Sequence, residues 1–271
     1  MDVRVALAGV LVVFLAGSCS ASYITMGVTV TPPEVVAEDV FQLKVTVLNS
    51  GDEEAHDVQL SLSLPEGFSS EPVYVGVLPP GRPYEHTFDV SIEDFVKYGT
   101  YPAMVKTHYA DANAYPFSTI SPTFIRYKQP TPFQIRGNVG EVSLVAGSEK
   151  DKELVLEVSN LDDKPHKILV KFHLPDELKA GFYSTELELN ERDAGKVTVP
   201  LRSFGALAGS TYVVFASMEY EDGGLHYSAT SGGIVRIVAQ EAEEKGDGTS
   251  WIPAAVIAAL VAALVYYQVK R

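Results

Sequence analysis

The chain has 271 residues, which is enough for one large domain or two of ordinary size. Its 35 acidic residues outnumber its 21 lysines and arginines, and the formal net charge is −14. Because binding to phosphates needs clustered basic side chains, this balance excludes a nucleic-acid partner.

The first 22 residues have the layout of a secretory signal peptide. Arg4 precedes an apolar run over residues 5–16, and small residues follow it. Cleavage after Ser18 or after Ser22 would satisfy the small-residue rule. Cys19 is the only cysteine of the chain, and it leaves a second possibility, cleavage with lipidation of that residue. With either end, we expect the mature protein to lie outside the cytoplasm.

Residues 23–240 contain an internal repeat. The segment from Leu43 to Asn49 matches the segment from Leu154 to Asn160, and Tyr101 matches Tyr212 at the same spacing of 111 residues. Apolar and polar residues alternate within each copy, which is typical of strands with one buried face. About seven short strands per copy predict an all-β protein with two tandem immunoglobulin-like β-sandwiches. We place them at residues 23–127 and 134–240, joined by a short, stiff Pro-rich linker at 128–133.

Several residues recur in both copies, and we expect them to be structural. Asparagine and glycine suit tight turns, and a proline ends a strand. The two tyrosines each open a late strand, either as a tyrosine corner, whose hydroxyl bonds to upstream backbone, or as half-buried strand residues. The predicted structural residues are Asn49, Gly51, Pro65, Tyr101, Asn160, Pro175 and Tyr212.

Acidic residues concentrate in the first copy, where acids outnumber bases by 14 to 5 over residues 23–127. In a sandwich of this kind, alternate loops gather at the end where the chain enters. Such an acidic tip could bind Ca²⁺, which favours carboxylate oxygens, or a basic partner, or it could simply be solvated. The candidate calcium ligands are Asp52, Glu53, Glu54, Asp57 and Asp111.

Two features of the second copy concern its surface. Residues 212–216 are apolar on both faces, so the outer face needs cover from a neighbouring strand, the first domain or a partner. His173 alternates outward between Phe172 and Leu174, which predicts a solvated strand residue.

The six histidines lack metal-ligand spacing, and no hydrolase elbow, phosphate loop or dinucleotide fingerprint is present in the sequence. We therefore expect no enzymatic activity and no cofactor.

An acidic linker over residues 241–250 leads to 19 uncharged residues, Trp251 to Val269. A helix of that length spans about 28 Å, close to the thickness of the hydrocarbon core, and this predicts a single transmembrane helix. Lys270 and Arg271 then lie in the cytoplasm, and chain order puts the acidic first copy farther from the membrane. Removal of the helix as a sorting or lipid-anchor signal is the alternative. A row of small residues favours helix pairing, and so a homo-oligomer, at Ala254, Ala258 and Ala262.

The string Leu43-x-Val-x-Val-x-Asn49-x-Gly51, followed by a leucine-rich strand ending in Pro65-x-Gly67, resembles the CARDB-type domains. These are immunoglobulin-like modules of bacterial and archaeal envelope proteins, associated with cell adhesion and surface layers. The resemblance covers residues 28–125. The second copy departs from it, since Leu161-Asp162 replaces Ser-Gly and Glu177 replaces a glycine.

Together these features predict a non-enzymatic, membrane-anchored surface protein of a prokaryotic cell envelope, with an archaeal source expected, and a structural, adhesion or protein-interaction role. The alternative is an accessory subunit of a membrane transport or secretion complex. A sugar-binding module ranks behind both, because residues 23–250 contain no tryptophan to form a binding platform. The expected partners are the lipid bilayer and another protein of the envelope or membrane.

Overall fold

The computed structural model describes residues 23–240, and these fold into strands joined by turns and loops. The predicted signal peptide, acidic linker and membrane span lie outside the described residues, as does the alanine row Ala254, Ala258 and Ala262. Within residues 23–240, no helix is long and apolar enough to cross a membrane. The prediction of an all-β fold is confirmed over this part of the chain.

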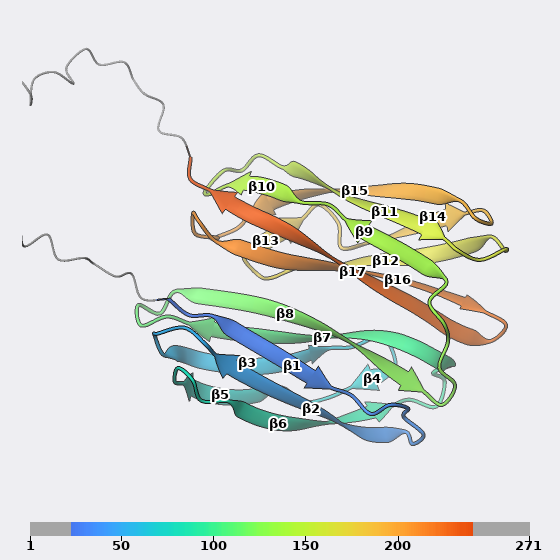
Figure 1. Cartoon of the computed structure of the whole chain (residues 1–271), viewed down its shortest axis with the longest axis horizontal. Helices are drawn as coiled ribbons and strands as arrows, with labels where there is room; N and C mark the ends of the chain where they lie inside the picture. Colours follow the sequence, from blue (N-terminus) through green and yellow to red (C-terminus); the bar gives the residue numbers. More distant parts are fainter. Residues whose placement is uncertain (1–22, 241–271) are drawn as a thin grey trace, which may run out of the picture. The chain divides into compact units, whose positions relative to one another are not determined.

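The first sandwich contains two antiparallel sheets (Figure 1). One has the strand order β1-β2-β6-β4, and β5-β3-β7-β8 form the other. The strands are β1 (Met26–Thr31), β2 (Val40–Asn49), β3 (Ala55–Ser63), β4 (Phe68–Ser69), β5 (Val73–Leu78), β6 (Tyr84–Ile92), β7 (Tyr98–Ala110) and β8 (Pro116–Tyr127).

The second sandwich repeats this plan. One sheet has the order β13-β15-β11-β9, and the other contains β14-β12-β16-β17, to which β10 adds in parallel. The strands are β9 (Ile135–Val139), β10 (Val142–Val145), β11 (Lys152–Asn160), β12 (His166–His173), β13 (Leu178–Ala180), β14 (Ser184–Leu189), β15 (Ala194–Ser203), β16 (Thr211–Asp222) and β17 (Leu225–Val238).

Each sandwich has its own hydrophobic core, because alternate side chains of every long strand point inward. On β2, Leu43, Val45 and Val47 are fully buried. The matching residues on β11 are Leu154, Leu156 and Val158, which are equally buried. Burying one such side chain stabilises the fold by about 1.5–3 kcal/mol. The alternation read from the sequence thus sets which face of each strand forms the core.

A short parallel pairing joins the two sandwiches into one sheet system. Leu225 and His226 at the start of β17 pair with Tyr98 and Gly99 at the start of β7. Gly99 has φ +152°, and a Cβ there would stand 2.1 Å from the carbonyl oxygen of His226. Only glycine permits such a close backbone approach. The described residues up to Val238 belong to one compact unit.

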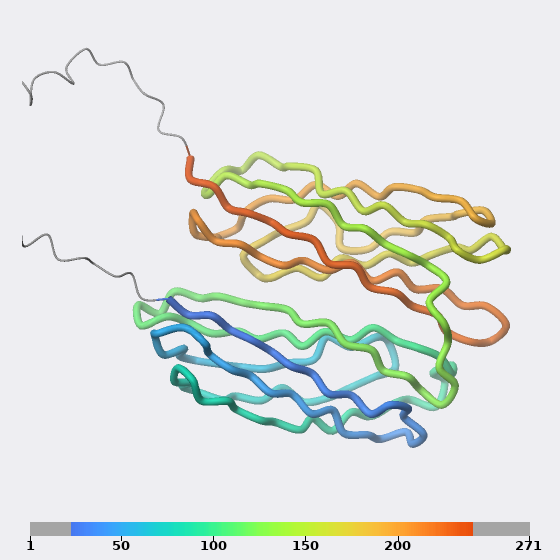
Figure 2. Tube along the Cα trace, viewed as in Figure 1, coloured from blue at the N-terminus to red at the C-terminus, as the bar shows by residue number. Residues whose placement is uncertain are grey.

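The segment between β8 and β9 is more than a linker. Its Thr131 is 8% exposed, and its side chain and backbone bond to β7 and β17. Figure 2 shows the chain crossing between sandwiches here, at the end opposite the start of β1. The proline-rich segment is therefore part of the contact between the sandwiches.

Candidate functional site

Asn49 fixes the turn after β2. Its side chain is fully buried. Nδ2 donates to the carbonyl oxygens of Glu53 (2.6 Å) and Leu78 (3.2 Å), and Oδ1 accepts from the amide of Gly51 (3.0 Å). Gly51 is needed because a Cβ there would stand 2.1 Å from the carbonyl oxygen of Tyr23. One amide side chain therefore ties the β2–β3 turn to the end of β5.

Asn160 reproduces this arrangement after β11. Its Nδ2 donates to the carbonyl oxygens of Lys164 (2.7 Å) and Asn190 (2.8 Å), and its Oδ1 accepts from the amide of Asp162 (3.0 Å). Asp162 stands where the first copy has Gly51, and its carboxylate lies 2.8 Å from His166 Nε2. The bond to His166 lowers the pKa of Asp162. The second copy has thus kept the turn and added a contact between a carboxylate and a histidine to it.

The paired prolines stand at equivalent turns. The carbonyl oxygen of Pro65 accepts from the amide of Phe68 at 3.2 Å, and that of Pro175 accepts from Leu178 at 3.1 Å. Each bond closes a tight turn before a short strand, β4 or β13. The two positions therefore play the same local role.

The two tyrosines differ. The Tyr101 hydroxyl donates to the carbonyl oxygen of Lys97, four residues upstream, at 2.8 Å, which is the geometry of a tyrosine corner. Tyr212 is also buried, but its hydroxyl makes no bond to upstream backbone within the described chain. Burial raises the pKa of both phenols. The shared sequence position thus carries a corner in the first copy alone.

The acidic loops of the first sandwich gather at one end of it. Asp52 accepts from the backbone amide of Tyr23 (2.7 Å), and Glu53 Oε1 accepts from the amide of Ala112 (3.0 Å). Asp111 accepts from the amides of two residues in its own turn, Asn113 (2.9 Å) and Tyr115 (2.8 Å). The carboxylates of Asp52, Glu53 and Asp111 therefore cap these loops by accepting hydrogen bonds from backbone amides.

The remaining calcium candidates do not converge with these. Asp57 has φ +49° and accepts a hydrogen bond from the Tyr74 hydroxyl at 2.9 Å, while Glu54 is exposed. Among residues 23–240, no group of three or more histidine, cysteine, aspartate or glutamate side chains is arranged to hold a metal ion. The calcium site stays a prediction from the sequence.

The start of β1 and the end of β17 lie at the same end of the compact unit (Figure 2). Residues Ile24 to Met26 line one groove together with Thr211 to Val213, and Thr211 pairs with Arg236 near the end of β17. The acidic loops share this end, because the Tyr115 hydroxyl donates to the carbonyl oxygen of Gly205 in the β15–β16 loop. The predicted membrane span lies outside the described residues, so the expectation that the first copy is farther from the membrane stays a prediction.

A buried polar network holds the two sandwiches together. The Thr131 hydroxyl donates to the carbonyl oxygen of His226 (2.7 Å), and Thr131 N donates to Thr100 Oγ1 (3.0 Å). The carbonyl oxygen of Thr100 accepts from Ser228 Oγ (2.7 Å), and His226 Nδ1 lies 2.9 Å from it. The His226 ring stacks on Tyr101 with centroids 3.9 Å apart. We call these five residues the junction network.

Glu219 adds a buried charge beside the junction network. It is 6% exposed and lies 3.2 Å from Lys171 Nζ and 3.4 Å from His226 Nε2. Burial by itself would raise the pKa of this carboxyl, but the bond to His226 and the charge of Lys171 lower it below its usual value. The carboxylate therefore stays ionised, with the Lys171 ammonium group as its counter-charge.

Glu177 is the second buried carboxylate, and it joins the sandwiches at the other end. Its two oxygens accept from Ser118 N (2.5 Å) and Ser118 Oγ (2.7 Å) on β8. Burial raises its pKa. In the sequence, Glu177 differs from the first copy, which has a glycine at the equivalent position, and no other feature marks it. Its function as a bridge depends on Ser118, which has no recognisable signal in the sequence.

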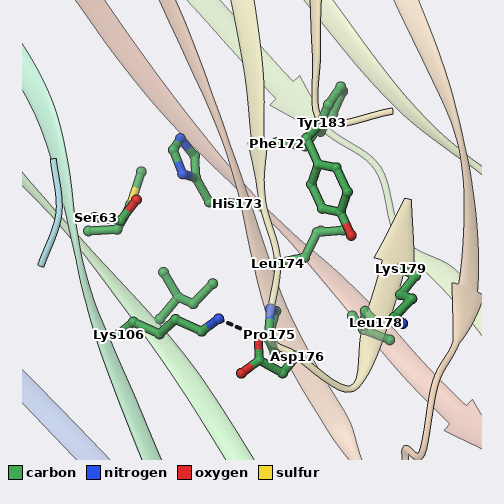
Figure 3. A pocket seen from close by; sticks show the side chains of 12 residues that line it. Ser63, Lys106, Phe172, His173, Leu174, Pro175, Asp176, Leu178, Lys179 and Tyr183 are labelled. Atoms are coloured by element: carbon green, nitrogen blue, oxygen red, sulfur yellow. Dashed lines mark hydrogen bonds and ion pairs between the residues drawn. The ribbon is translucent and has the colours of Figure 1, made fainter. Parts of the chain in front are cut away.

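A cavity of about 270 Å³ lies between the sandwiches beside these contacts (Figure 3). Lys106 of β7 reaches across it to Asp176. His173 also points into this space, with Nε2 3.0 Å from Ser217 Oγ, and it is half-buried. Burial lowers its pKa to about 4. The prediction of a solvated His173 is wrong, because the first sandwich covers the outer face of β12.

The outer face of β16 is covered only in part. Phe215 is half-buried, whereas Val213 is 47% exposed beside its cross-strand neighbour Ile234, at 38%. Val213 borders the groove that it shares with Ile24 and Met26 of the first sandwich. Intramolecular cover therefore accounts for part of this apolar face and leaves a strip at its edge.

The geometry of the contact between the sandwiches is suited to holding them in one relative position. Of the carboxylates buried between the sandwiches, Glu177 is bonded across the gap and Glu219 to a neighbour on the same sheet. Such satisfied networks fix one arrangement of the groups that they join. The sequence did not reveal this site, because its residues are serines, threonines and histidines scattered over strands.

Comparison with family models gives one match. Residues 35–110 match the NPCBM-associated NEW3 domain of alpha-galactosidase. The match covers most of the first sandwich, and it supports an immunoglobulin-like β-sandwich there. The matching family model is that of the NEW3 domain, and it is not the CARDB-type model that the sequence motif resembles. No protein of curated function matches the chain.

Solved structures show remote likeness. Red sea bream transglutaminase is 15% identical with a TM-score of 0.28, and 80% of this chain covers 31% of it. A Salmonella alpha-2-macroglobulin variant is 12% identical at 0.31, with 79% of this chain covering 16% of it. The YadV chaperone is 12% identical at 0.30, with coverage of 76% and 98%. The chain thus spans under a third of the first two, and these scores carry no argument about function.

Proposed function

We propose that this chain is a non-enzymatic, membrane-anchored surface protein whose paired sandwiches act as one stiff module for protein interaction in the cell envelope. The observation that carries the proposal is the junction network, which joins the sandwiches through buried hydrogen bonds around Thr100, Thr131 and His226. Two domains that moved freely relative to each other would not keep these buried hydrogen bonds. The NEW3 match and the resemblance to CARDB-type modules support an accessory role without catalysis.

The anchor rests on the sequence. The uncharged stretch Trp251 to Val269 is the length of a membrane span, and the acidic linker before it is short.

Stiffness can be tested on the full chain, in a Cys19→Ser background that leaves two labelling sites, by spin labels on Cys variants of Tyr74 and Tyr183, one exposed residue in each sandwich. The proposal predicts a narrow distance distribution that broadens in a Gly99→Val background, because the added side chain collides with the His226 carbonyl group. Gly27→Val is the matched control, since its φ is not positive and the nearest atom to a Cβ there is the Leu48 carbonyl oxygen at 3.6 Å. A broad distribution in the unmodified background would overturn the proposal.

The alternative, an accessory subunit of a membrane transport or secretion complex, is favoured by the exposed strip at Val213 and Ile234. Mild-detergent extraction of the full chain followed by native mass measurement separates the two. A stoichiometric membrane partner that is lost in Val213→Ser would establish the subunit role. Recovery with envelope material, unaffected by that substitution, would support the first proposal.

A further inference from the structure

An aromatic pocket lies between the sandwiches at the end that carries the acidic loops. Its volume is about 600 Å³. Tyr109, Tyr115 and Phe117 of the first sandwich line it together with Phe204 of the second. The Phe117 ring is stacked on Tyr109, with centroids 5.5 Å apart, and tilted against Tyr115 at 5.2 Å. These four rings define the aromatic pocket.

The charge that faces the aromatic pocket is negative. Its lining includes Asp57, Asp176 and Glu177 but neither a lysine nor an arginine. The lining histidine, His108, has a lowered pKa because of burial, so it adds no positive charge at neutral pH. Lys106 pairs with Asp176, and the ammonium group of Lys179 lies over the Phe204 ring, so two lysines offset two of the three carboxylates. The pocket therefore combines π-faces with a net excess of negative charge.

One ring of the pocket already holds a cation. The ammonium group of Lys179 lies 3.3 Å from the ring centroid of Phe204. Cations on aromatic faces are stabilised by the ring quadrupole, and a planar guanidinium stacks on tyrosine and phenylalanine while it bonds to carboxylates. The other rings carry no such cation within the described chain, and Phe204 itself is 56% exposed.

We propose that the aromatic pocket binds an arginine side chain presented by a partner protein. Charge complementarity argues for this occupant, because the three carboxylates that line the pocket outnumber the two lysines that contact it, and the surrounding loops of the first sandwich are acidic. The inference rests on the proposed role in protein interaction and names the chemistry of that partner. It also gives the acidic end a function that does not need a metal ion.

The probe for the test is a short Gly/Ser peptide with two arginines, titrated into the full chain in detergent micelles. Tyr115 and Phe117 report on binding through aromatic side-chain resonances. We expect Phe204→Ala and Asp57→Asn each to weaken binding by about fivefold to thirtyfold, the range for loss of a cation–π or charge contact. Tyr115→Phe keeps the ring and should change affinity much less than Tyr115→Ala does.

Two controls make the outcome decisive. The citrulline version of the peptide has nearly the same shape without the charge, and it should not bind. Phe95→Leu removes an aromatic ring that is 65% exposed on the same sandwich and does not line the pocket, and it should have no effect. Equal binding of the citrulline peptide, or binding that Phe204→Ala leaves intact, would refute the inference, as would occupancy of the pocket by an oligosaccharide in place of the peptide. None of these results bears on stiffness, so the proposed function is tested separately.

Discussion

The two cores and the contact between the sandwiches are built from different chemistry. Each core consists of alternating aliphatic side chains, such as Leu60 and Leu156, that are fully buried. The contact region buries threonine, serine, histidine and glutamate and leaves cavities between them. The difference indicates that each core supplies stability, whereas the polar contact specifies one relative arrangement, because hydrogen bonds are directional and apolar burial is not.

The largest effect is expected in the cores. Leu60→Ala and Leu156→Ala each remove a fully buried side chain and should lower the free energy of unfolding by about 2–5 kcal/mol. Chemical denaturation measures both. Val77→Ala, at a residue 50% exposed, is the control and should cost much less. Core variants no more destabilising than this control would contradict the division between cores and contact region.

The second effect is a pH dependence of the contact region. His173 has a folded pKa of about 4, because burial disfavours its charged form. The unfolded chain has the ordinary value near 6.5 and therefore binds the proton first as pH falls. Stability is then fully present above pH about 6.5 and declines toward pH 4, by up to about 3 kcal/mol.

Denaturation of the unmodified chain and of His173→Gln across this range isolates that contribution. Glutamine can still bond to Ser217, but it cannot titrate, so the slope between pH 4 and 6.5 should flatten. His86→Gln on β6, away from the contact region, should leave the slope closer to that of the unmodified chain. An unchanged slope in His173→Gln would show that the histidine stays accessible in the fold.

The turn asparagines test whether the two copies are equivalent. Asn49→Ala and Asn160→Ala each remove three hydrogen bonds and leave buried backbone groups unpaired. Each should cost about 1–3 kcal/mol. Thermal melts compare them directly, and a loss confined to one copy would argue that the other turn is held by different contacts.

The smallest effect is expected at the surface. Lys44 and Glu85 form an ion pair at 2.9 Å, with side chains 50% and 59% exposed. Such pairs contribute about 0–1 kcal/mol, because water screens the charges. Glu85→Ala should therefore shift the melting temperature little, and added salt should remove even that shift. A loss comparable to that of the turn variants would mean that this pair supports the β2–β6 pairing.

Much of the fold could be predicted from local pattern. The alternation around Leu43 and Leu154 indicates strands and their buried faces, and the repeat indicates two equivalent units. The turn positions Asn49 and Asn160 were also readable, because their bonds are mostly within a few residues of the chain. His173 was misread because its surroundings come from the other sandwich.

The candidate site could not be predicted in the same way. Ser118 and Glu177 are 59 residues apart, and Thr100 and Ser228 are 128 apart. Short polar residues at such positions look like ordinary solvent-facing members of a strand. Only the packing of one sheet on another turns them into buried partners.

The sequence by itself determined the strands, the two cores and the structural turns, since these depend on periodicity and on contacts close along the chain. Tertiary structure decided that the sandwiches share a sheet system, that both ends of the compact unit lie together, and that aromatic and acidic residues of both sandwiches form one pocket. The physical reason is that close backbone approach at Gly99 and matched hydrogen bonds between distant strands fix this arrangement, and neither has a period in the sequence.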